Sequence, residues 1–197
     1  MLDPRITPSE HTKYIPKSCF HHICALKHIR DSLHFLMMCS IAAALVTSRV
    51  DYTNSVLYGI AAKYISRLQH TQNTLARVGA GNHTPCFNLA TLSKPHWLPV
   101  HGCIKFKIAT VTHKAIYTGK PPHLANLVQW HTPCRTLRSA SANFLSVTHC
   151  NISFGARGFR SAVLVIWNSL PSNVLSCETL IISIQPLPLP SDPSQRL

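Results

Sequence analysis

The sequence is poor in acidic residues. Only six of its 197 residues are Asp or Glu, and none of the six lies between Tyr52 and Cys177, a stretch that holds twelve Lys and Arg residues. Two-metal phosphoryl transfer, glycosidic acid/base pairs and Ser-His-Asp triads all need a carboxylate that holds a cation or orients a base. We therefore predict that the chain is not an enzyme and that it uses no cofactor.

Charged residues of either sign are also scarce. They make up 13% of the chain, about half of the usual share, whereas the apolar share of 46% is that of an ordinary globular protein. A free-standing domain normally carries mixed charge over its surface for solubility. The composition therefore favours a chain that is part of something larger, or one that packs against another protein.

Most of the charged residues are basic. The formal net charge is +13 and the pI is about 9.8. Lys and Arg bind polyanions through charge and counterion release. We expect weak, salt-dependent binding of RNA or DNA, and the alternative is a basic surface with no specific partner.

The sequence lacks both a leader and a long apolar run. Residues 1–4 show neither the basic start nor the apolar stretch of a signal peptide. The most apolar window, residues 35–46, spans about 12 residues and is too short to cross a bilayer. Eight cysteines occur without a C-x-x-C pair, which is typical of reduced thiols. These features predict an intracellular protein, in the cytoplasm or nucleus, with no membrane partner.

The order of polar and apolar residues predicts a mainly α fold. We expect an extended lead-in over residues 1–16, because three prolines punctuate it, and a helical region over 17–130. A small irregular α+β region should follow over 131–180, and a Pro-rich disordered tail over 181–197. Apolar spacing predicts helices over residues 17–33, 36–49, 63–78, 100–117 and 122–128, and leaves strand or helix open for 154–167.

Soft metal ligands occur but do not complete a site. Cys19 and His22 would share one face of a helix, as two ligands of a zinc ion could, but the other two ligands have no obvious source. The simpler interpretation is a core-facing helix that happens to carry them, and we predict no metal site. A Cys-His nucleophile pair has no local signature either.

Basic residues beside aromatic residues are better candidates for binding. Such clusters occur at 105–107 and 157–160, where Phe106 and Phe159 either stack on bases or belong to the core. A third basic cluster lies at 135–138. The predicted nucleic-acid-binding residues are Lys63, Arg67, Arg77, Lys105, Lys107, Arg135, Arg138, Arg157 and Arg160.

Several segments match one family in order. Residues 17–30 have the sequence K-S-C-F-H-H-I-C-A-L-K-H-I-R, and residues 44–59 have A-L-V-T-S-R-V-D-Y-T-N-S-V-L-Y-G. Residues 67–77 contain R-L-Q and Q-N, and residues 96–108 contain H-W-L-P-V and I-K-F-K-I. Shorter matches are P-P-H-L, R-T-L-R-S and W-N-S-L-P. Together, over about Leu2 to Leu175, they resemble LINE-type non-LTR retrotransposon reverse transcriptases of the Jockey-like and chicken-repeat-like group.

The resemblance implies a thumb-like helical bundle that lies after the polymerase palm. The family's aromatic-Ala-Asp-Asp motif has no counterpart in this sequence. By resemblance, the chain is a non-catalytic fragment that would hold template RNA and growing DNA, with the polymerase half or another protein as a further partner. Two alternatives stay open, a protein-interaction module and a non-functional pseudogene-like product.

Overall fold

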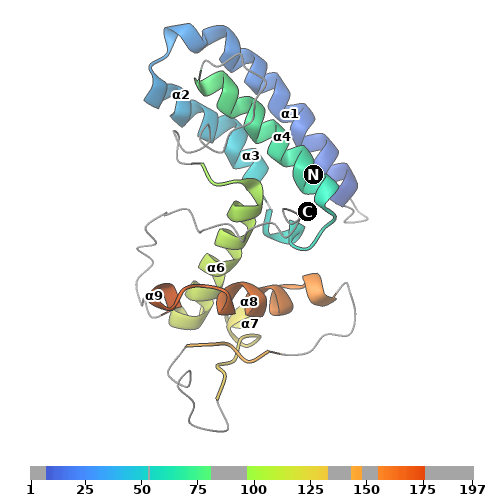
Figure 1. Ribbon diagram of the computed structural model, residues 1–197, viewed down its shortest axis with the longest axis vertical. Coiled ribbons are helices and arrows are strands. Elements are labelled where there is room, and N and C mark those ends of the chain that lie inside the picture. The colour runs from blue at the N-terminus through green and yellow to red at the C-terminus, as the bar shows by residue number, and fades with distance from the viewer. Residues whose placement is uncertain (1–7, 53, 81–96, 133–142, 148–154, 176–197) are drawn as a thin grey trace, which may run out of the picture.

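The computed structural model describes residues 8–52, 54–80, 97–132, 143–147 and 155–175. These residues are mainly helical, as the sequence predicts (Figure 1). The described part contains no strand and a single antiparallel bridge between Trp130 and Leu145. The α+β region predicted over 131–180 is therefore not supported, because its longest described element is a helix. The predicted tail lies outside the described residues.

Two long helices, α1 (Pro8–Ile29) and α4 (Ala62–Ala80), lie side by side in the first half of the chain. Both run in the same direction (Figure 1). Shorter helices connect them: a 3-10 turn η1 (Arg30–Ser32), α2 (Phe35–Ala42), a π-helical turn η2 (Ala43–Thr47), α3 (Ser48–Asp51) and a 3-10 turn η3 (Asn54–Leu57).

Helix α1 corrects the expectation of an extended lead-in. It begins at Pro8, so the boundary predicted after residue 16 falls inside a helix. Proline is well suited to the first position of a helix, where its missing N–H is not needed. Pro16 does remove one internal hydrogen bond. Its neighbours Ile15 and Cys19 are buried in the core, and this burial offsets the loss.

The second half of the chain is organised around α6 (Val100–Thr118). This helix leads away from the α1–α4 pair, and α8 (Phe159–Asn168) packs across it (Figure 1). The segment left open between strand and helix is therefore helical from residue 159 onward. The remaining elements are α7 (Pro122–Ala125), the 3-10 turn η4 (Gly155–Arg157) and α9 (Ser172–Leu175).

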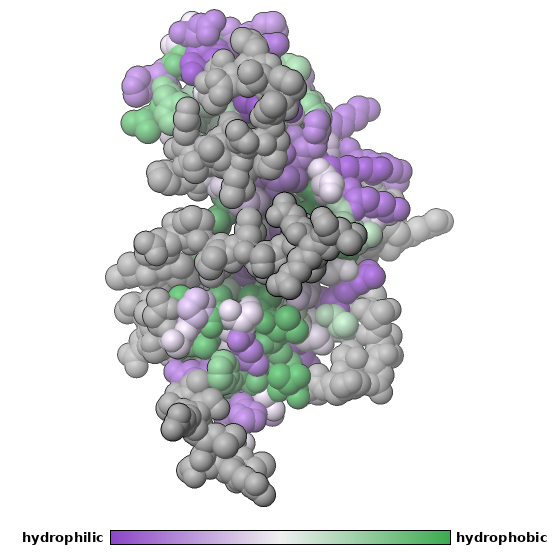
Figure 2. All heavy atoms as spheres, viewed as in Figure 1, coloured by the Kyte–Doolittle hydropathy of each residue, from purple (hydrophilic) through white to green (hydrophobic). Residues whose placement is uncertain are grey.

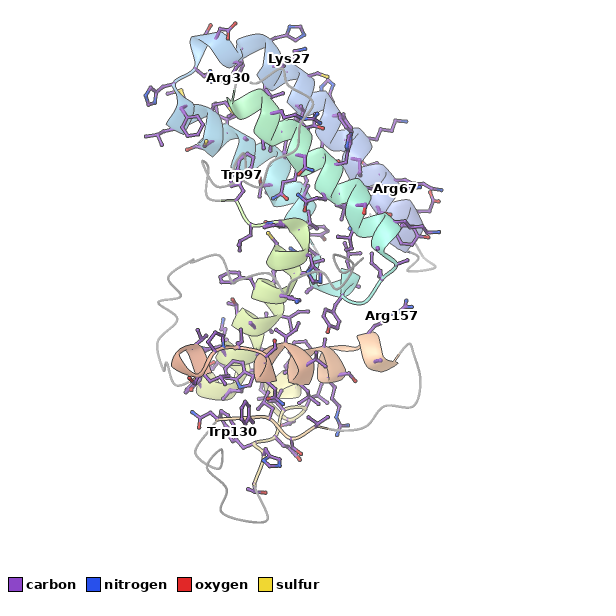
Figure 3. The ribbon with its side chains drawn as sticks, in the orientation of Figure 1. Lys27, Arg30, Arg67, Trp97, Trp130 and Arg157 are labelled. Carbon is purple, nitrogen blue, oxygen red and sulfur yellow. The ribbon has the colours of Figure 1, made fainter. Side chains whose placement is uncertain are left out.

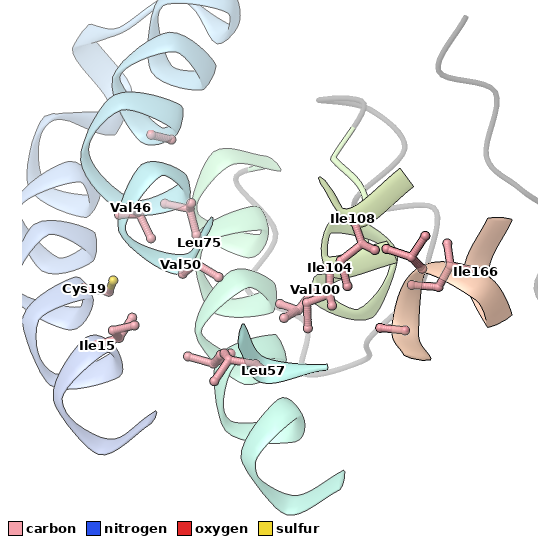
Figure 4. Close-up of a cluster of buried hydrophobic side chains, with 14 of the residues drawn as sticks. Ile15, Cys19, Val46, Val50, Leu57, Leu75, Val100, Ile104, Ile108 and Ile166 are labelled. Atoms are coloured by element: carbon pink, nitrogen blue, oxygen red, sulfur yellow. The ribbon is translucent and has the colours of Figure 1, made fainter. Parts of the chain in front are cut away.

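One apolar core joins the two halves (Figure 4). It runs from Ile15 and Cys19 of α1 through Leu75 of α4 to Ile104 of α6 and Ile166 of α8. The stripe of α1 differs from the predicted one. Helical spacing predicts that Phe20, Ile23, Leu26 and Ile29 face the core. Ile23 and Leu26 are buried as predicted, but Phe20 and Ile29 are 36% and 47% exposed, and Ile15 and Cys19 are buried instead.

Polar side chains tie α4 to the start of α6. The Gln72 side-chain amide donates to the Leu98 carbonyl at 2.7 Å, and the Val100 N–H donates to the Gln69 Oε1 at 2.9 Å. Gln69 also donates to Gln72, at 3.0 Å. The first N–H groups of a helix have no partner within it, so Gln69 satisfies one of those of α6. Gln69 and Gln72 thus hold the start of α6 at Val100 in place.

A second polar clamp holds residues 143–145 against α8. The Asn168 side chain accepts from the Leu145 N–H at 2.9 Å and donates to the Leu145 carbonyl at 3.1 Å. The Trp167 indole N–H donates to the Asn143 carbonyl at 3.0 Å. The first two residues of the W-N-S-L-P segment therefore act within the fold, by pairing backbone groups of a neighbouring segment.

None of the described helices is both long enough and apolar enough to cross a membrane.

Candidate nucleic-acid interface

Two predicted binding residues, Lys63 and Arg67, lie exposed on the first half of α4. They are four residues apart and so share one helix face. Tyr64 lies between them, with its ring centroid 5.0 Å from the Lys63 ammonium and 6.0 Å from the Arg67 guanidinium carbon. Such cation–π contacts restrain long side chains without neutralising their charge. Both cations therefore remain available to an anion.

Helix α1 brings further cations alongside. The ring centroids of Phe20 and His70 lie 6.4 Å apart, and the Arg30 Nε donates to the Gly79 carbonyl at 3.1 Å. These two contacts set a nearly constant register of about fifty residues between the parallel helices. Because residues three or four apart share a helix face, Lys17 comes opposite Arg67, and Lys13 comes opposite Lys63.

We call Lys13, Lys17, Lys63 and Arg67 the basic strip. All four side chains are exposed, and hydrophilic side chains project from this edge of the helix pair (Figures 2 and 3). One carboxylate lies at its end, where the Lys13 ammonium pairs with Glu10 at 2.8 Å. The sequence prediction omitted both lysines of α1. The amphipathic spacing of α1 was the available signal, but Lys13 had been assigned to an extended segment.

Arg77, further along α4, is partly engaged within the helix. It is half-buried and donates to the Thr74 hydroxyl at 3.2 Å, while that hydroxyl donates to the His70 carbonyl at 2.9 Å. On the same register, the exposed Lys27 of α1 comes level with Arg77. This pair lies ten residues, or nearly three helical turns, from Lys17 and Arg67.

On α6, Lys107 is exposed and Lys105 is half-buried. Lys107 lies near the Asp51 carboxylate. Burial raises the pKa of Asp51, while the Asn54 amide, which donates to its Oδ1 at 3.1 Å, and the charge of Lys107 act in the opposite direction. The α6 cations therefore present less unopposed charge than the basic strip does. Phe106 between them is half-buried.

Arg157 and Arg160 are exposed near the start of α8. The stem of Arg157 packs on Gly59, in the turn that precedes α4, so this cation lies near the Lys63 end of the basic strip (Figure 3). Phe159 packs against the core, which is the alternative to base stacking that the sequence left open. Arg135 and Arg138 lie outside the described residues.

The cysteines and histidines that the structure describes do not form a metal-binding cluster. Among the described residues, no three His, Cys, Asp or Glu side chains lie close enough to hold a metal ion. Burial raises the pKa of Cys19, and burial together with the Asp51 carboxylate raises that of Cys103 to about 12. Both thiols therefore stay protonated at neutral pH, whereas a cysteine nucleophile reacts as the thiolate.

Comparisons with protein-family models, with curated proteins and with solved structures found no match for this chain. The chemistry of the site therefore has to be inferred from its own groups. Exposed Lys and Arg side chains from two parallel helices, with one carboxylate at their edge, can bind phosphates by charge and hydrogen bonding.

Proposed function

We propose that the chain is a non-catalytic nucleic-acid-binding module that meets the phosphodiester backbone with its basic strip. The observation that carries this proposal is the register of α1 and α4, which brings the exposed Lys17 level with Arg67 and the exposed Lys13 level with Lys63 along the two helices. Paired cations repeated one helical turn apart favour an extended polyanion over a single small anion.

The segments that resemble LINE-type reverse transcriptases support the same proposal. Their polar side chains make interior contacts: Arg30 to Gly79, Gln72 to Leu98 and Asn168 to Leu145. The resemblance therefore concerns the framework that holds α1, α4, α6 and α8 together. We infer that this framework is related to the thumb-like part of such an enzyme, and that it holds nucleic acid without polymerase chemistry.

The basic strip can be tested by a matched pair of double variants. Lys63→Gln/Arg67→Gln removes two strip charges, and Lys114→Gln/Lys120→Gln removes two exposed charges at the other end of the molecule. Binding of a fluorescent 20-nucleotide RNA and of the DNA of the same sequence is measured by anisotropy across a salt series. We expect the first variant to lower the slope of log K against log salt concentration by roughly 1.5, and the second to change it little.

Two results would count against the proposal. An absence of binding at low salt, or a binding constant without salt dependence, would remove nucleic-acid binding itself. Equal losses in the two double variants would show that the net charge acts without a defined surface. Primer extension by the purified chain, in the presence of Mg²⁺ or Mn²⁺, would contradict the non-catalytic part.

A further inference from the structure

The basic strip continues into a pair of rings. Phe20 follows Lys17 by three residues on α1, and His70 follows Arg67 by three residues on α4, so both rings lie one turn beyond these cations on the same surface. Their centroids are 6.4 Å apart and their planes are inclined by 46°. His70 is exposed, and Phe20 is 36% exposed although helical spacing predicted that it faces the core.

The position of this ring pair bears on the kind of nucleic acid that would bind. In a duplex the faces of the bases are stacked on one another, so a protein ring meets only their edges and the backbone. An unpaired base offers its face, and stacking on an aromatic side chain is tolerant of sequence. Phosphate-binding cations followed directly by exposed rings are the combination that single-strand-binding surfaces use.

The surroundings of the ring pair do not oppose an anion. The carboxylates on α1 and the turn that follows it are those of Glu10, which pairs with Lys13, and Asp31, which lies beyond the end of α1. Tyr14 offers an instructive contrast. It is 70% exposed, but it lies six residues from Phe20 and therefore points about 120° away from it around α1.

We propose that the basic strip prefers single-stranded to double-stranded nucleic acid, with Phe20 and His70 as the surface on which an unpaired base stacks. Lys17, Lys63 and Arg67 hold the adjoining phosphates. This inference rests on the proposed function, since it names the form of nucleic acid that the same surface takes.

The test uses a 15-nucleotide DNA strand, alone and annealed to its complement, with the full chain. We expect tighter binding of the single strand. Phe20→Ala should weaken single-strand binding at least about fivefold while leaving duplex binding nearly unchanged. Tyr14→Ala, which removes an exposed ring that points about 120° away from Phe20 on the same helix, is the matched control and should leave both affinities nearly unchanged. Far-ultraviolet circular dichroism establishes that each variant keeps its helices.

A third variant keeps the inference testable if Phe20→Ala fails to fold. Phe20→Trp preserves the ring, and stacking of a base on the indole should quench the added fluorescence with the single strand and not with the duplex. Equal affinity for both forms, or equal losses in Phe20→Ala and Tyr14→Ala, would overturn the preference. If the preference fails but the slope of log K against log salt concentration is still lower in Lys63→Gln/Arg67→Gln than in wild type, the proposed nucleic-acid binding stands without the single-strand preference. No binding of either form at low salt would remove both proposals.

Discussion

The aliphatic stem of Arg157 lies directly against Gly59. A Cβ at position 59 would come within 2.9 Å of the Arg157 Cγ, closer than such atoms approach in folded proteins. Gly59 also has a φ of 70°, in the left-handed region that side chains other than glycine disfavour. The last residue of the Y-G segment is therefore constrained twice, by its own backbone and by a residue almost a hundred positions later.

Gly59→Ala should destabilise the protein more than Gly119→Ala does. Gly119 ends α6 with a φ of 65°, but nothing lies within 4 Å of a Cβ placed there. Gly119→Ala thus carries only the backbone cost, about 1–2 kcal/mol, and Gly59→Ala adds the displacement of Arg157. Urea unfolding of the two single variants measures the difference. In Gly59→Ala/Arg157→Ala, measured against Arg157→Ala, the extra cost should disappear, and an extra cost that persists would mean that it does not arise from Arg157.

Gln72→Ala should loosen the junction between α4 and α6. The variant leaves the Leu98 carbonyl without its 2.7 Å partner, and a lost hydrogen bond of this kind costs about 1–2 kcal/mol. Gln69 contacts both Gln72 and the Val100 N–H, so the costs of Gln69→Ala and Gln72→Ala should not add. A double-variant cycle in chemical unfolding checks this, and strictly additive costs would show that the two glutamines act independently.

The two tryptophans of the family-like segments should differ in their contribution to stability. The sequence predicts burial of both, whereas the structure places Trp167 in the core at 2% exposure and leaves Trp97 half-buried. Trp167→Ala should cost about 3–5 kcal/mol, and Trp97→Ala should cost less. Thermal unfolding ranks the two variants. An equal effect on the melting temperature would mean that Trp97 is as well packed as Trp167.

Asp51 should make stability depend on pH in an identifiable way. Burial raises its pKa above 3.8, so the folded state holds its proton more tightly than the unfolded state does. Its contribution to stability is therefore present below pH 3.8 and is lost as the pH rises through the folded-state pKa. The stability of Asp51→Asn relative to wild type should increase with pH across this window and then level off.

The matched control for Asp51 is Asp31→Asn, which removes an exposed carboxylate from the turn after α1. Unfolding free energies from urea titrations between pH 3.5 and 7, taken as differences from wild type, compare the two variants. A constant difference for Asp51→Asn over the whole range would contradict the role given to burial.

The long helices could be predicted from the sequence more closely than the faces they bury. Spacing predicted helices over 63–78 and 100–117, against observed helices over Ala62–Ala80 and Val100–Thr118. The predicted buried face of α1 was right at Ile23 and Leu26 and wrong at Phe20 and Ile29. The parallel neighbour α4 decides which side of α1 is covered, and nothing in the local sequence of α1 specifies that neighbour.

The candidate site could be predicted only in part, because it too depends on how α1 and α4 lie against each other. Lys63 and Arg67 could be found as exposed cations on a helix, but the lysines of α1 join them only through a register that the Phe20–His70 and Arg30–Gly79 contacts set. Lys107 is the opposite case, a cation that the sequence prediction included although it lies near a carboxylate. Its proximity to Asp51 arises from the packing of α3 on α6, and these residues are more than fifty positions apart in the chain.

Several cations are engaged in hydrogen bonds within the fold. The rate of polyanion binding and the number of ions released on binding should therefore depend on different sets of charges. Arg30 is bonded to the Gly79 carbonyl, Arg49 to the Leu45 carbonyl and Arg77 to the Thr74 hydroxyl. Their charges still add to the long-range field, so the rate of encounter with a polyanion should follow the whole net charge of +13. The ions released at equilibrium should follow only the few side chains free to reach phosphates. We therefore expect fast association with a polyanion together with a binding constant that depends only weakly on salt concentration.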